Sequence, residues 1–244
     1  MTTMESAAGK ILQRAVEMDQ KEQYTMALVL YQEGLEILVN SIKETTDQTK
    51  KKHFKERAEQ YMDRAERIKC LIEDKKSRGK YREQIKIENG SSGYGYGSVF
   101  GRFLDAGVTQ IHIEDPYVRT FHQCQNLVRF CELAVQKCHS LSKIKLITTK
   151  ESTEEVKHQI ARLDELEKSL LKRSVNLMID YSETLHDRRI ILSNGWVIKI
   201  GRGLDYFKAP EGKFSLGACD LELRLCHETI IDIYHQSHLQ DSIN

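Results

Sequence analysis

The character of this sequence changes near residue 90, and this change limits what the chain can fold into. Before it there is no proline, little glycine and much Lys, Glu, Gln, Ala and Leu. After it come runs rich in β-branched residues, such as IHIEDPYV, KIKLITT, VNLMIDY and WVIKI. At 244 residues the chain has room for one large or two small domains. We therefore expect an α+β protein with a helical domain first and a sheet domain second.

Helical periodicity recurs three times in the first half. The apolar stripes are Ile11, Leu12, Ala15 and Val16; then Ala27, Tyr31, Gly34 and Leu38; then Phe54, Ala58, Tyr61, Ala65, Ile68 and Ile72. Asp47 and Thr49 are candidate caps for the third helix. The connections are short, which favours antiparallel neighbours. Residues 4–76 are therefore predicted to form a three-helix bundle.

The second half alternates strand and helix patterns. Strands are expected at 111–113, 143–148 and 175–180, and helices at 121–137 and about 153–172. Asn194-Gly195 lies between RRIIL and WVIKI, which is typical of a β-hairpin. This order implies a mostly parallel, mixed sheet with an antiparallel hairpin, covered by helices. A last helix is expected to use Ile230, Ile233 and Tyr234.

A segment rich in glycine and serine, residues 88–97, joins the two halves. Four glycines and two serines in ten residues predict either a flexible joint or an ordered glycine loop. We place the helical domain at residues 1–80, a linker at 81–97 and the sheet domain at 98–244.

Composition narrows the function. The net charge is +1, from 37 Lys and Arg against 36 Asp and Glu, which argues against a purely electrostatic nucleic-acid binder. No run of apolar residues is long enough to span a bilayer, and the N-terminus has no secretory pattern, so any membrane contact is expected to be peripheral. The six cysteines are expected to be cytosolic thiols. Cys219, Cys226 and His227 have the wrong spacing for zinc, so neither a metal nor a cofactor is expected.

The third predicted helix carries a second stripe beside its apolar one. This shoulder consists of Lys55, Glu59, Met62, Glu66 and Lys69. It is either a solvated face with paired charges or one wall of a groove for a partner helix, with Met62 as the apolar anchor. The second helix favours the groove, because its apolar arc is wide. That arc extends to Leu28, Leu35, Val39 and Ile42.

Two motifs in the bundle resemble a known family. Tyr24-x-x-Ala27-Leu28-x-Leu30-Tyr31, followed by Tyr61-Met62-Asp63-Arg64-Ala65-Glu66-Arg67-Ile68-Lys69, is similar to the microtubule-interacting and trafficking (MIT) domain. The resemblance covers about residues 5–78. It implies a three-helix bundle that binds the C-terminal helical tails of ESCRT-III subunits. By position, Met62 would anchor the tail and Glu66 would accept a tail arginine.

The second half holds two clusters of candidate site residues. His186-Asp187-Arg188-Arg189 is the first. In the second, Lys199, Arg202, Lys208 and Lys213 are interleaved with Tyr206, Phe207 and Phe214. This basic-aromatic run is a solvated loop with core aromatics, a contact surface for anionic membrane, or a nucleic-acid surface.

The second half also resembles a known domain. IEDPY, HDRRI, NGWVIKIGRGLDYF and the closing CHET are similar to the phospholipase D-like domain that follows the MIT domain in one protein family. The resemblance implies self-association as a homodimer, binding to phosphoinositide membranes and a role in abscission at the end of cytokinesis. It also implies a cytoplasmic protein that is peripheral on late endosomes and present at the midbody.

The catalytic motif of phospholipase D, H-x-K-x4-D, is degenerate in this chain. His186 matches the histidine, but Arg188 stands at the lysine position and Ser193 at the aspartate position. No second motif is present. We therefore expect no catalytic residues, and an adaptor that binds ESCRT-III tails and acidic membrane but no nucleic acid. The alternative is a phosphodiesterase centred on His186 and Arg188, with Asp187 as the substitute carboxylate.

Overall fold

The computed structural model describes residues 3–79, 81–150 and 155–236 of the chain. The chain divides into two compact units, the first ending at Glu83 and the second beginning at Gln84. The first contains three helices and the second a mixed seven-stranded sheet, so the predicted α+β class is confirmed. Within the described residues, none of the helices has the length and apolar character needed to cross a membrane.

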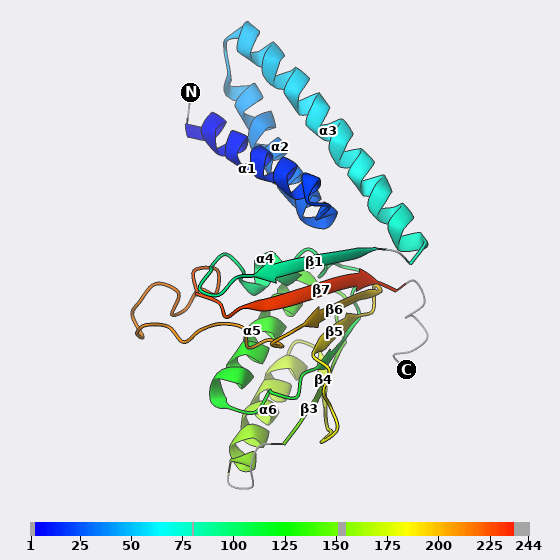
Figure 1. The fold of residues 1–244 in the computed structure, drawn as a ribbon, viewed down its shortest axis with the longest axis vertical. Helices are drawn as coiled ribbons and strands as arrows, with labels where there is room; N and C mark the ends of the chain where they lie inside the picture. The colour runs from blue at the N-terminus through cyan, green and yellow to red at the C-terminus, as the bar shows by residue number, and fades with distance from the viewer. Residues whose placement is uncertain (1–2, 80, 151–154, 237–244) are drawn as a thin grey trace. The chain divides into compact units, whose positions relative to one another are not determined.

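The first unit contains α1 (Thr3–Gln20), α2 (Tyr24–Glu44) and α3 (Gln48–Ser77), and α2 packs against both of the others (Figure 1). The predicted apolar stripes supply its core. Its buried apolar side chains include Leu12, Ala15, Ala27, Tyr31, Leu38, Ala58, Ala65, Ile68 and Ile72. Asp47 caps α3 as expected, because its carboxylate accepts hydrogen bonds from the amides of Thr49 and Lys50.

An ion pair ties α3 to α1. Arg64 reaches both carboxylate oxygens of Asp19, from Nε and from Nη2, at 2.7 Å each. The hydroxyl of Tyr31 on α2 donates to the same carboxylate at 3.3 Å. Arg64 of the MIT-like motif therefore has a structural role, because its ion pair with Asp19 links α3 to α1.

The second unit is built on a sheet with the order β1-β7-β6-β5-β2-β3-β4 (Figure 1). The strands are β1 (Arg82–Ile87), β2 (Gln110–Glu114), β3 (Lys143–Thr148), β4 (Asn176–Tyr181), β5 (Arg189–Leu192), β6 (Trp196–Ile200) and β7 (Thr229–His235). β2, β3 and β4 are parallel, whereas the pairs β2–β5, β5–β6 and β6–β7 are antiparallel. The helices are α4 (Tyr96–Phe100), α5 (Phe121–Lys137) and α6 (Val156–Leu171). The expected start of α6 at 153 lies outside the described residues.

The two faces of the sheet differ in chemistry. The face covered by α5 and α6 is apolar, and includes Ile113, Leu146 and Ile190 (Figure 1). Side chains alternate along a strand, so the residues between these project from the opposite face. That face carries charges, with Arg189 paired in register with Lys199 and Glu114.

Two expectations for this unit were wrong. Ile230, Ile233 and Tyr234 belong to the strand β7, not to a helix. Burial alternates along it, with Ile231 and Ile233 buried and Ile230 exposed, which is the period of a strand. Such a short apolar run does not separate strand from helix by sequence alone.

The segment 81–97, expected as a linker, is also structured. Residues 82–87 form β1, and the glycine-rich part is an ordered loop. The amides of Gly90 and Gly93 donate to the carbonyls of Cys226 and Glu222, both at 2.8 Å. Gly95 lies so close to Glu222 that a Cβ there would be 2.5 Å from its Oε2. Of the two readings of this segment, the ordered glycine loop is therefore correct.

Candidate functional site

The predicted tail-binding stripe on α3 is exposed. Met62 keeps 53% of its surface open to solvent, which is unusual for so large an apolar side chain. Its helix neighbours Lys55, Glu59, Glu66 and Lys69 are also exposed. On α2, Val39 is exposed and Leu35 is half-buried. These side chains are placed where a partner could contact them, and their binding role stays a prediction.

The basic-aromatic run does not form one surface. Lys199 projects from the charged face of the sheet, since it pairs in register with Arg189 and Asp232. Arg202 and Lys208 instead line a cavity beside α5. Lys213 is exposed in the loop that follows. The four cations that are neighbours in sequence are thus divided between different sides of the domain.

Two of the three aromatic residues in the run belong to the core. Tyr206 and Phe207 are buried, and the Tyr206 hydroxyl donates to the carbonyl of Tyr94 at 2.9 Å. The Tyr206 ring also packs edge-on against Tyr96, with 6.0 Å between centroids. Phe214, in contrast, is fully exposed.

The arginines of the HDRR segment are held by the fold. Arg188 donates to the carbonyl of Gly201 and lies over the Tyr117 ring, 4.5 Å from its centroid. Arg189 makes two hydrogen bonds to the buried Glu114. His186 is exposed. None of these HDRR residues lines the cavity beside α5, so the segment and the cavity are separate candidate sites.

The cavity beside α5, here called the basic cavity, has a volume of about 430 Å³. Its walls come from the first half of α5, from residues 202–210 and from residues 218–227. The cationic and titratable side chains that line it are Arg129, Arg202, Lys208, Arg224, His122 and His227. Among the described lining residues, Asp205 is the single carboxylate. The cavity is thus strongly cationic although the chain as a whole is nearly neutral.

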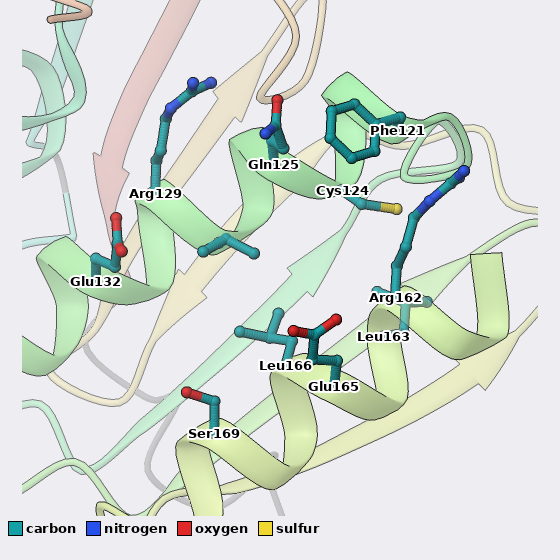
Figure 2. A pocket seen from close by; sticks show the side chains of 11 residues that line it. Phe121, Cys124, Gln125, Arg129, Glu132, Arg162, Leu163, Glu165, Leu166 and Ser169 are labelled. Carbon is teal, nitrogen blue, oxygen red and sulfur yellow. The ribbon is translucent and has the colours of Figure 1, made fainter. Parts of the chain in front are cut away.

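The carboxylate of Asp205 accepts hydrogen bonds from side chains of α5. Its Oδ1 accepts a hydrogen bond from Asn126 at 2.9 Å, and its Oδ2 accepts one from Gln123 at 3.2 Å. Asn126 in turn accepts a hydrogen bond from Arg129 through its own Oδ1, at 3.0 Å. This chain of contacts orients the Arg129 guanidinium without neutralising it. In Figure 2, Arg129 points away from α6.

Arg224 is buried, with 9% of its surface exposed. Its Nε and Nη2 donate to the carbonyls of Gly217 and Ala218, which fix the orientation of the guanidinium. Burial, followed by the positive charge of Arg129, lowers the pKa of Arg224. The pKa of His227 is lowered in the same way, by burial and then by Arg202 and Lys208. Like charges are therefore held near one another around this cavity.

The loop Lys208–Leu225 leaves the cavity wall and returns to it. A bridge between Phe207 and Cys226 closes its base, together with a hydrogen bond from the Lys208 amide to the Leu225 carbonyl at 2.8 Å. Near its tip, Phe214 is fully exposed and Leu216 is 89% exposed. This loop, which begins and ends at the wall of the basic cavity, therefore leaves two large apolar side chains in solvent.

A second hollow of about 430 Å³ lies between α5 and α6 (Figure 2). Leu163 and Leu166 supply apolar lining, and Arg162 lies over the ring of Phe121, 5.5 Å from its centroid. Its lining holds both signs of charge, with Arg129 and Arg162 against Glu132 and Glu165. This hollow therefore lacks the one-sided charge of the basic cavity.

Sequence reasoning missed two of the four arginine and lysine side chains that line the basic cavity, Arg129 and Arg224, and its two histidines, His122 and His227. Arg129 and His122 lie on α5, and Arg224 and His227 lie in the segment before β7. Within the described part of the chain, no three side chains of His, Cys, Asp or Glu gather as a metal site requires. The composition of the closing segment gave no signal for the site, because residues 218–227 hold Asp220 and Glu222 against Arg224 alone.

A helical bundle with the MIT-like motif, followed by a mixed-sheet domain with a cationic cavity, defines an MIT protein with a phospholipase D-like C-terminal domain. Two family models match accordingly. The MIT (microtubule interacting and transport) domain matches residues 5–70, and the phospholipase D-like domain at the C-terminus of MIT matches residues 93–235.

The chain is 46% identical over 233 residues to MIT domain-containing protein 1 of Mus musculus. This alignment covers 96% of the chain and 94% of the mouse protein. The chain belongs to this family of MIT proteins with a phospholipase D-like domain.

Proposed function

We propose that this protein is an adaptor that couples ESCRT-III tails to acidic phospholipid membrane and acts in abscission. The observation that carries the membrane half is the loop Lys208–Leu225, which exposes Phe214 and Leu216 beside the basic cavity. Aromatic and aliphatic side chains settle in the interfacial region of a bilayer, while nearby cations are attracted to anionic headgroups. The domain combines both features on one loop.

The tail-binding half rests on family membership and on the exposed stripe of α3. MIT domains generally bind ESCRT-III tails, and the chain has such a domain. Met62 offers an exposed apolar anchor between Glu59 and Glu66, which suits an amphipathic helix that carries leucine and arginine. Lys55, Lys69, Leu35 and Val39 complete the proposed contact set.

Catalysis is not part of this proposal. His186 lies three residues before β5 and Ser193 lies directly after it, so the whole strand stands between the two positions along the chain. The Ser193 hydroxyl is occupied by the amides of Thr109 and Gln110. Asp187, the substitute carboxylate, lies 3.6 Å from Arg189. None of these contacts would orient His186 as a nucleophile.

Self-association through the C-terminal domain would strengthen both contacts, because linked weak sites can exceed either alone by about 10²–10⁴. We place the protein in the cytoplasm, peripheral on late endosomes and at the midbody. The membrane cations are Arg202, Lys208 and Lys213, while Lys199, His186, Arg188 and Arg189 stay candidates that lie outside the basic cavity.

Co-flotation tests the coupling directly. A fluorescent ESCRT-III tail peptide should float with phosphoinositide vesicles only when the full-length protein is present. Arg202→Glu with Lys208→Glu should abolish flotation and leave peptide binding in solution unchanged. Flotation should also weaken with salt, since exposed charges are screened within about 8 Å at 0.15 M. A peptide that does not float with the wild-type protein would refute the adaptor function.

A further inference from the structure

We propose that the groove between α5 and α6 docks an amphipathic helix of a partner protein, one whose apolar stripe is flanked by side chains of both charges. This contact goes beyond the proposed adaptor function, because the groove shares no residue with the proposed tail-binding or membrane-binding sets. The shape of the groove, its apolar floor and the charges along its rims carry the assignment.

Two neighbouring hollows form one continuous groove, here called the α5–α6 groove. The first has a volume of about 430 Å³ and lies between residues 121–132 of α5 and residues 162–169 of α6. The second, of about 270 Å³, lies between residues 128–136 and residues 166–173. Both are lined by Val128, Glu132, Leu166 and Ser169, so each hollow opens into the other.

The floor of the α5–α6 groove is apolar. Leu163, Leu166 and Leu170 of α6 are buried, and Val128 and Val135 of α5 are half-buried. Leucine and valine side chains at the bottom of a groove between two helices leave space for the apolar ridge of a third helix. The floor therefore favours a helix whose apolar side chains recur at steps of three and four residues.

The length of the groove also suits a helix. From Phe121 to Gln136 it follows α5 for about 22 Å at the usual helical rise, which is room for about four turns of a second helix. At one end Phe121 is 59% exposed, and Arg162 lies beside it, 5.5 Å from the ring centroid (Figure 2). The exposed ring extends the apolar surface to the end of the groove.

Charged side chains of both signs stand along the rims. On α6, Arg162 is followed by Glu165 and then by Arg173, and Glu132 stands on α5. None of these four forms an ion pair with another residue of the described chain. Arg129 also lines the groove, but it donates to Asn126 and points away from α6 in Figure 2. The rims therefore offer two positive and two negative partners beside an apolar floor.

This mixture of signs selects the occupant. An anionic membrane, a nucleic acid or an acidic peptide would be repelled by Glu132 and Glu165. A helix with basic side chains beside these two carboxylates and acidic side chains beside Arg162 and Arg173 would satisfy all four charges. Flanking charges of this kind set partner choice and direction when helices pair. Because Arg162 and Glu165 are three positions apart on α6, the partner should carry opposite charges three or four positions apart on that flank.

A peptide library tests the site. It displays helices with a fixed stripe of leucine and with Glu, Lys or Ala at the flanking positions, and it is selected on the full-length protein. The enriched peptides should carry both Lys and Glu on the flanks, three or four positions apart. A selection that enriches no helix, or that enriches helices with flanks of one sign only, would overturn the proposal.

Charge reversal in the protein locates the binding of an enriched peptide. Glu132→Lys with Glu165→Lys should weaken it at least tenfold in a fluorescence titration, and a peptide with its Lys residues changed to Glu should recover binding to this variant. Both positions are exposed, so the fold is spared. Asp164→Lys with Glu167→Lys reverses two exposed charges of α6 that line neither hollow, and should change nothing. Equal affinity of the peptide for the wild type and the groove variant would overturn the proposal.

Sedimentation velocity distinguishes a partner helix from a second copy of this chain. The Glu132→Lys, Glu165→Lys variant should have the same oligomeric state as the wild type at equal concentration. A loss of self-association in this variant, but not in Asp164→Lys with Glu167→Lys, would assign the groove to a second copy and overturn the partner helix.

Discussion

Arg189 and Glu114 form a two-pronged ion pair across β5 and β2, with Nε 2.7 Å from Oε2 and Nη2 3.0 Å from Oε1. They are partners in register, and Glu114 is buried. The hydrogen bonds that Arg189 donates to the Glu114 carboxylate raise the pKa of Arg189. This contact joins the parallel and antiparallel parts of the sheet and fixes one cation of the HDRR segment.

Arg189→Met should therefore affect stability more than membrane binding. Glu114 would be left buried without its partner, and the free energy of unfolding should fall by about 2 kcal/mol in urea denaturation. Flotation of the folded variant should not change. Arg82→Met, at an exposed position of β1, is the matched control and should be neutral. A stable variant that no longer floats would assign Arg189 to the membrane surface instead.

Met62→Asp should weaken tail binding without unfolding the bundle. The side chain is exposed, so the change adds a charge to the proposed contact face and spares the core. Titration with an ESCRT-III tail peptide should show at least a tenfold loss of affinity, about 1.4 kcal/mol. Gln60→Asp adds the same charge on another side of α3 and should leave the affinity unchanged. Equal affinities for wild type and Met62→Asp would remove Met62 from the site.

Replacing both Phe214 and Leu216 by serine should reduce vesicle binding by at least tenfold. Each side chain is expected to contribute about 1.5–3 kcal/mol if fully inserted, and neither supports the fold because both are exposed. Sedimentation with vesicles measures the loss. Leu171→Ser changes another exposed leucine, at the end of α6, and should have no effect. Unchanged sedimentation of the double variant would show that the loop tip stays outside the bilayer.

Gly203→Ala should destabilise the second domain. Gly203 has φ +63°, and a Cβ there would lie 2.1 Å from Oδ2 of the buried Asp115. That carboxylate accepts a hydrogen bond from the Leu204 amide at 3.0 Å, so both the backbone and the contact must shift. We expect a loss of more than about 2 kcal/mol, measured by urea denaturation. Gly97→Ala, in α4 with open space around it, should be neutral or slightly stabilising, and a similar loss there would contradict this account.

Stability should fall as the pH drops below about 6.5, in part because of His112. Burial lowers the pKa of His112, and so do Lys145 and Arg189, while Glu114 and Asp180 act in the opposite direction. In this pH range the unfolded histidine binds a proton that the folded one does not, so protonation favours unfolding. The contribution of His112 to the free energy of unfolding is complete at pH values above the pKa of the histidine in the unfolded chain. It is lost as the pH falls toward the lower pKa that His112 has in the folded protein.

The measurement is the free energy of unfolding at two pH values, about 7.5 and 5.5, on either side of the unfolded histidine pKa. In the His112→Gln variant, the free energies of unfolding at the two pH values should differ less than they do in the wild type. His139→Gln, at an exposed position, should leave the difference as it is in the wild type. An unchanged difference in His112→Gln would assign the pH dependence to other groups.

Local patterns were sufficient for much of the fold. The stripe from Ala58 to Ile72 predicts α3, and Asp47 predicts its start, because helix periodicity and capping depend on neighbours a few residues away. Asn194-Gly195 predicts the β5–β6 hairpin for the same reason, and Gly195 indeed has φ +92°. The Ile230–Tyr234 segment failed because a short apolar run satisfies both periods, and only pairing with β6 makes it a strand.

The two-domain division, the three-helix bundle, the hairpin and the family motifs could all be predicted from the sequence, because each depends on residues that are neighbours along the chain. Which cations share a site depends instead on tertiary packing. Lys199 and Arg202 are three positions apart, yet the strand directs Lys199 to the charged face, while Arg202 joins the basic cavity. Arg129 and Arg224 are far apart in sequence, and the packing of α5 beside the closing segment brings them to one cavity. The electrostatic potential at a site is the sum over all charges that lie near it in space, so it depends on how distant segments pack.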